Sequence, residues 1–79
     1  YNRTINILIQ KARLLFAMDK HNEVIQIVDF ILNTDSKDST AWELKGQTLK
    51  KLHNETKGNL CLENAKKYKK EPKSTLLSL

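Results

Sequence analysis

Two histidines and one cysteine are the side chains of this 79-residue chain best suited to catalysis or metal binding. An imidazole transfers protons near neutral pH, and a thiolate acts as a nucleophile or zinc ligand. However, His21 and His53 lie far apart in the sequence, and Cys61 is the only cysteine. Neither a His-Glu-x-x-His motif nor a glycine-rich phosphate loop occurs. We therefore predict that the chain is not an enzyme and has no catalytic residues, metal site or cofactor.

The same three residues have simpler structural roles. His21 and His53 fall in short polar segments between apolar stretches, where solvated turn residues are common. Cys61 falls on an apolar helix face, so we expect it in the core. A single thiol suits a reducing compartment. The expected location is therefore cytoplasmic, with the nucleus or a cytoskeletal assembly as alternatives.

The elements that must position these residues are predicted to be helices. Apolar residues recur every three or four positions over 5–18, which places them on one helix face. Residues 24–32 are spaced similarly, although their β-branched side chains also suit a strand. Thr40 and Glu43 have capping-box spacing, which predicts that a third helix starts at Thr40. A fourth helix is expected to end at Pro72.

The chain resembles itself when it is aligned, without a gap, to a copy displaced by one 34-residue period. This alignment pairs apolar or small residues on the helix faces: Leu8 with Trp42, Ala12 with Gly46, Leu15 with Leu49, Met18 with Leu52, Ile27 with Cys61, and Val28 with Leu62. Two helices per 34-residue unit are the sequence signature of the tetratricopeptide repeat (TPR). The period also favours a helix over a strand for 24–32.

On these residues the chain resembles the TPR family, over 5–72. The family's helix-packing positions correspond here to Leu8, Ala12, Leu15, Trp42, Gly46, Leu49, Gly58, Leu62 and Ala65. The resemblance implies an all-α fold of antiparallel helical hairpins stacked as an α-solenoid. The units are a lead-in (1–4), a divergent repeat (5–38), a second repeat (39–72), and the start of a third repeat or a capping helix (73–79). A HEAT-like helical array is the alternative.

Some residues depart from the family pattern or need a particular explanation. Lys11 and Lys45 occupy a site that is usually apolar in the family. Gly46 and Gly58 both fall inside helices, where glycine costs about 1 kcal/mol relative to alanine. A close approach of two helices is the expected reason. Trp42 is expected in the core.

The resemblance implies a non-catalytic protein-interaction scaffold within a larger protein or assembly. In the family, the first helices of successive repeats line a concave groove. The corresponding residues here are Asn6, Ile9, Arg13, Phe16, Glu43, Gln47 and Lys50. The positions that hold a terminal carboxylate in chaperone-binding members read Ile9, Arg13, Leu44, Ser74 and Ser78, so binding of that kind is not predicted.

The net charge of +5 belongs to the second half, where residues 39–79 hold nine lysines and four glutamates. A basic patch is predicted at the end of the fourth helix, from Lys66, Lys67, Lys69, Lys70 and Lys73. Cations there also complement the helix dipole. The alternative function is an RNA-binding surface that uses this patch with Lys50, Lys51 and Lys57.

The sequence opens on Tyr1 instead of methionine, so we expect it to be a piece of a longer protein. Two repeats bury little surface by themselves. Further repeats, or a partner, are therefore expected to cover Leu76, Leu77 and Leu79. The longest apolar run, 14–18, is too short for a membrane span, and none is predicted.

Overall fold

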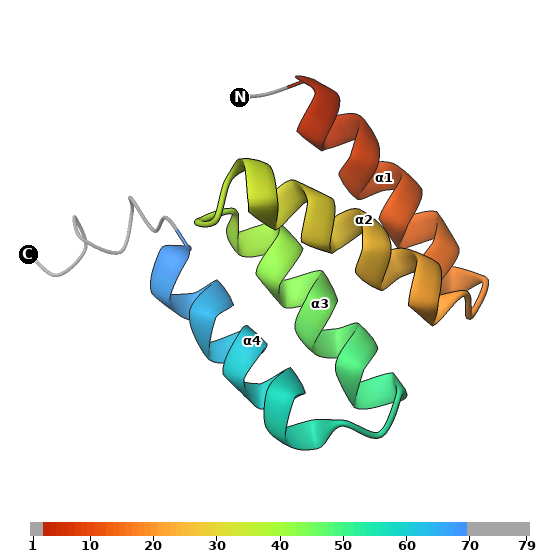
Figure 1. Ribbon diagram of the computed structural model, residues 1–79, viewed down its shortest axis with the longest axis vertical. Helices are drawn as coiled ribbons and strands as arrows, with labels where there is room; N and C mark the ends of the chain where they lie inside the picture. Colours follow the sequence, from red (N-terminus) through yellow and green to blue (C-terminus); the bar gives the residue numbers. More distant parts are fainter. Residues whose placement is uncertain (1–2, 70–79) are drawn as a thin grey trace, which may run out of the picture.

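Four helices make up the part of the chain that the structure, a computed structural model, describes, which is residues 3–69. They are α1 (Arg3–Ala17), α2 (His21–Thr34), α3 (Ser39–Lys51) and α4 (Glu55–Tyr68) (Figure 1). No strand occurs in this part, so the predicted all-α fold is confirmed, including a helix over 24–32. None of these helices is long and apolar enough to cross a membrane. The repeat start expected at 73–79 lies outside the described residues.

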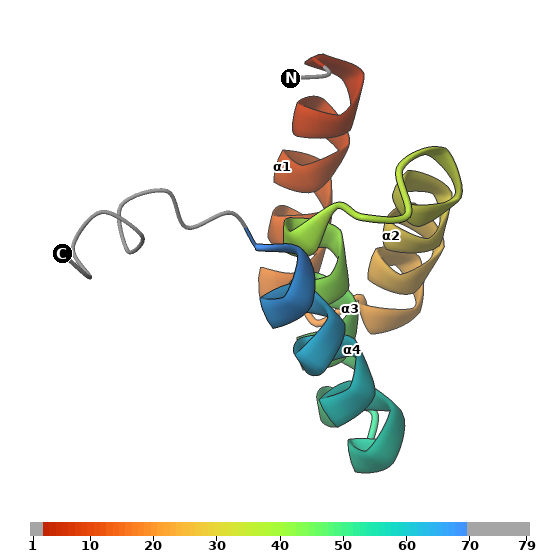
Figure 2. The ribbon, with the colours of Figure 1, turned by 90° about the vertical axis from the view of Figure 1, so that its left-hand side faces the viewer.

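Each helix packs against the next one in the chain, and α1 also contacts α3. Figure 2 shows that α2 is set to one side of α1 and α3. The core cluster consists of Ile5, Ile9, Ala12, Val24, Val28, Ile31, Ala41 and Leu44. These residues come from α1, α2 and α3. The centre of the core is therefore the junction where α3 covers the first hairpin.

The repeat period is also present in the backbone of the two hairpin turns. Asp19 and His53, which occupy equivalent positions of the two repeats, are the non-glycine residues with positive φ in the described part, at 62° and 66°. The next amide donates to a carbonyl five positions back in both turns: Lys20 to Leu15 at 2.9 Å, and Asn54 to Leu49 at 2.8 Å. Different side chains thus form the same turn, which joins the first helix of each hairpin to the second.

Two helix boundaries differ from those expected. The N-cap of α3 is Asp38, whose Oδ1 accepts a hydrogen bond from the Ala41 amide at 2.9 Å. The prediction of a helix start at Thr40 was wrong, because this carboxylate already satisfies an amide of the first turn. The last residue of α4 is Tyr68, and Lys69 is extended. The helix therefore ends earlier than the predicted end at Pro72, which lies outside the described residues.

The ends of the predicted apolar faces are also exposed. Met18 and Leu52 are 52% and 39% exposed, because both lie beyond the last residue of their helix. Trp42, which was expected in the core, is only half-buried, and its Nε1 donates a hydrogen bond to the Ser36 carbonyl at 2.8 Å. This bond ties the loop before α3 to the first turn of the helix.

Candidate functional site

Five of the seven side chains predicted to form a groove line two adjoining hollows along α1 and α3. The larger hollow, of about 400 Å³, is lined by Phe16, Gln47, Lys50 and Lys51. The smaller, of about 90 Å³, is lined by Arg13, Thr40, Glu43, Leu44 and Gln47. Gln47 borders both hollows, so they form one surface, which we call the α1/α3 groove.

The other two predicted groove residues lie elsewhere. Ile9 is 3% exposed and belongs to the core cluster, so its placement in an open groove was wrong. Asn6 is exposed but lines neither hollow. Lys51 does line the groove although it was not predicted. Its position directly after Lys50 breaks the three- and four-residue spacing that marks one helix face.

The α1/α3 groove combines an aromatic ring with unpaired charges. Phe16 is half-buried and packs against the core cluster. Lys50 and Lys51 line the hollow beside Phe16, and Arg13 and Glu43 line the smaller hollow. Within residues 3–69, none of these four charged side chains forms an ion pair. They are therefore available to a bound molecule.

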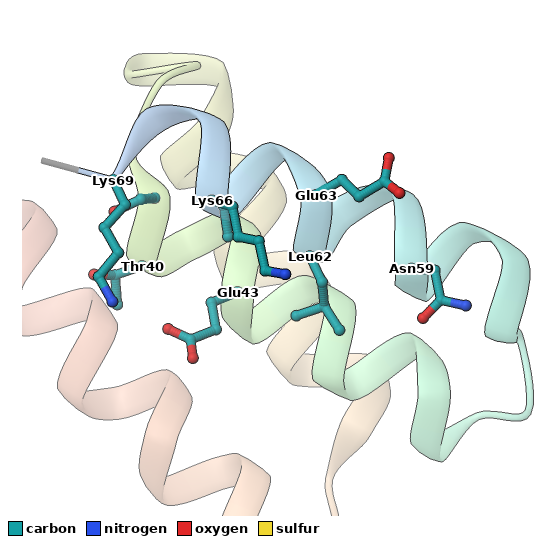
Figure 3. Close-up of a pocket in the computed structure, with 9 residues that line it drawn as sticks. Thr40, Glu43, Asn59, Leu62, Glu63, Lys66 and Lys69 are labelled. Carbon is teal, nitrogen blue, oxygen red and sulfur yellow. The ribbon is translucent and has the colours of Figure 1, made fainter. Parts of the chain in front are cut away.

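A second surface, which we call the α3/α4 hollow, has a volume of about 590 Å³. It is lined by Ser39, Thr40, Glu43, Asn59, Leu62, Glu63, Ala65, Lys66 and Lys69. Figure 3 shows Leu62 directed from α4 toward α3, with Lys66 and Glu43 on facing helices. The apolar part of the α3/α4 hollow is therefore surrounded by charges of both signs.

The lysines predicted as one basic patch are divided between different surroundings. Lys66 and Lys69 line the α3/α4 hollow together with two glutamates. Lys67 does not line it, and its Nζ lies 5.4 Å from the centroid of the Tyr68 ring. Lys70 and Lys73 lie outside the described residues. Lys66 and Lys69 therefore share their surface with acidic groups, which reduces the attraction of that surface for phosphates.

The side chains best suited to catalysis or metal binding lie in different surroundings. His21 is the first residue of α2, and its side chain is only 16% exposed, so its assignment as a solvated residue was wrong. Its ring meets Phe16 edge-on, with centroids 5.5 Å apart, while His53 is exposed. Burial raises the pKa of the Cys61 thiol, which weakens it as a nucleophile. In the described residues, no three His, Cys, Asp or Glu side chains are grouped to hold a metal.

Lys45, one of the two lysines at a position that was expected to be apolar, forms an ion pair. Lys45 Nζ on α3 lies 2.8 Å from Asp29 Oδ1 on α2. The same ammonium is 5.8 Å from the Trp42 ring centroid. Lys11, at the equivalent position of the first repeat, is exposed and has no ion pair within residues 3–69. The two repeats thus differ in what surrounds the same position.

Comparison of the chain with protein-family models, curated proteins and solved structures gave no match. Its function is therefore inferred from its own repeat and from the surfaces described above.

Proposed function

We propose that the chain is a non-catalytic protein-binding module of TPR-like repeats, and that the α1/α3 groove binds a segment of a partner protein. The shared period of the sequence and of the turn geometry supports this assignment. The helices α1 and α3 are the first helices of successive hairpins, the position that lines the binding groove in that family. Hairpins related in this way stack as an α-solenoid, with each unit in contact with its neighbour.

The observation that carries the proposal is the hollow beside Phe16. A half-buried aromatic ring offers a contact for one apolar side chain, and burial stabilises such a contact by about 25 cal/mol per Å². Lys50 and Lys51 border the same hollow without intramolecular ion-pair partners in residues 3–69. We infer that the ligand is a peptide with an apolar residue next to acidic ones. The groove lining includes no histidine, cysteine or aspartate, so we propose binding without chemistry.

The test is a selection of peptides from a displayed random library on the whole chain, followed by affinity measurement in solution. We expect the selected peptides to share an apolar residue flanked by Asp or Glu. The variants Arg13→Glu and Lys51→Glu should each weaken binding by about tenfold, which corresponds to about 1.4 kcal/mol. Lys57→Glu is the matched control, because Lys57 is exposed on α4 and lines neither hollow of the groove.

Two outcomes would contradict the proposal that the α1/α3 groove binds a partner peptide. One is selected peptides without acidic residues whose binding is insensitive to both groove variants. The other is binding of a single-stranded RNA that weakens log-linearly with salt and is lost when Lys66, Lys67, Lys69 and Lys70 are changed to Gln. The second outcome would transfer the function to the basic second half of the chain. Circular dichroism of each variant separates lost binding from lost folding.

A further inference from the structure

Each residue of the second hairpin has a counterpart one repeat earlier, in the first hairpin. The surfaces at the two ends of the molecule can therefore be compared residue by residue. On α3, Ala41 and Thr48 are fully buried, and Ala41 belongs to the core cluster with the first hairpin. Their counterparts on α1 are Ile7 and Leu14. These are 61% and 62% exposed. The α1 counterparts of these two buried α3 residues are therefore apolar and uncovered, and Gln10, the counterpart of the buried Leu44, is exposed as well.

The surface that receives α3 also has an open counterpart. In the first hairpin, Val28 and Ile31 of α2 belong to the core cluster that α3 completes. Their counterparts on α4 are Leu62 and Ala65, which line the α3/α4 hollow (Figure 3). The hollow is thus the second repeat's version of a surface that a helix covers in the first repeat.

The charges on the exposed face of α1 and in the α3/α4 hollow are also complementary. The ion pair between Lys45 and Asp29 joins α3 to α2. The counterpart of Lys45 is Lys11, beside Ile7 and Leu14 on α1, and the counterpart of Asp29 is Glu63, in the α3/α4 hollow. Lys11 and Glu63 are both exposed, and neither has an ion pair within residues 3–69. Since α1 and α4 make no contact, the two cannot meet in one molecule as folded here.

We propose that a second copy of this chain occupies the α3/α4 hollow, so that copies associate head to tail. Ile7 and Leu14 of one copy pack over Leu62 and Ala65 of the next, and Lys11 pairs with Glu63. Such a contact joins different surfaces, so each added copy leaves one free end and the assembly is open-ended. The charged rim of the hollow keeps the association weak and dependent on concentration. The hollow shares Thr40 and Glu43 with the smaller hollow of the α1/α3 groove, but the contact uses neither Phe16 nor the lysines beside it, and it does not rest on the proposed function.

The continuation of the chain beyond Lys69 is the competing occupant. In the register of the repeat, the sequence position that corresponds to Lys45 is Leu79. A leucine carries no charge to pair with Glu63, whereas Lys11 of a second copy does. This difference favours the second copy.

The test is sedimentation velocity of the whole chain over a wide range of concentrations. We expect the average mass to rise with concentration above the 9.2 kDa monomer. Lys11→Glu and Glu63→Lys should each remain monomeric, because like charges then face each other. An equimolar mixture of the two variants should associate again, since in a contact between unlike copies the negative charge introduced by Lys11→Glu can face the positive charge introduced by Glu63→Lys. Lys57→Glu, outside the hollow, should behave as the unmodified chain.

The recovery in the mixture separates a broken contact from a variant that fails to fold. A monomer at every concentration overturns the proposal and assigns the hollow to the chain's own continuation. Association of the single variants equal to that of the unmodified chain also overturns it. Arg13→Glu and Lys51→Glu should associate normally, so a failure of the groove proposal and a failure of this one give different results.

Discussion

Gly46 of α3 and Gly58 of α4 lie against each other's backbone. A Cβ at Gly46 would lie 2.8 Å from the Gly58 carbonyl oxygen, and a Cβ at Gly58 would lie 2.9 Å from the Gly46 carbonyl oxygen. Real Cβ atoms essentially never lie so close to such an atom. The crossing of α3 and α4 therefore has no room for a methyl group on either helix.

We expect Gly46→Ala and Gly58→Ala each to destabilise the fold by about 1–3 kcal/mol, because the helices must move apart. Helix propensity alone predicts the opposite, a gain of about 1 kcal/mol. Denaturant unfolding followed by circular dichroism gives the free energy of unfolding. The control is Thr56→Ala, an exposed position of α4. Glycine variants as stable as the unmodified chain would show that the crossing relaxes freely.

Trp42 stabilises the start of α3 in two separable ways. Trp42→Phe keeps an aromatic ring but removes the hydrogen bond to the Ser36 carbonyl, and should cost about 1 kcal/mol. Trp42→Ala also removes the ring and should cost about 3 kcal/mol. Thermal unfolding of both variants measures the difference. Equal losses would mean that the half-buried ring contributes no packing energy.

The ion pair between Asp29 and Lys45 should show measurable coupling. A double-mutant cycle with alanine at both positions is expected to give about 0.5–1 kcal/mol, which decreases as salt is added. The comparison pair is Lys20 and Glu23. Their charged atoms are 4.0 Å apart, and their side chains are roughly half exposed. Its coupling should be close to zero. Equal coupling energies for both pairs would argue that burial at the α2–α3 contact does not strengthen the ion pair.

Cys61 should make stability depend on pH in the alkaline range. Burial raises the pKa of its thiol above the usual 9.0, against the opposing effect of Lys45. The folded chain therefore holds this proton to higher pH than the unfolded chain does. The resulting stability is complete below about pH 9 and is lost as pH rises through the folded-state pKa. Unfolding of the unmodified chain and of Cys61→Ala should diverge in this range, and a constant difference across it would contradict the burial argument.

The four helices and their pairing into hairpins could be predicted from the sequence, because both follow from the local spacing of apolar residues. The repeat period also relates the residues that form matching turns. The α1/α3 groove was predicted in part. Phe16 and Gln47 were named from the resemblance to the TPR family, and both line the groove.

Only the tertiary structure decided which apolar residues are covered. Ile7 and Ile9 are chemically identical and two positions apart on α1, yet Ile9 is buried and Ile7 is 61% exposed. Both are apolar members of the same short stretch, so their side-chain chemistry does not distinguish them. Coverage depends on where α2 and α3 lie around α1, and that arrangement comes from long-range packing.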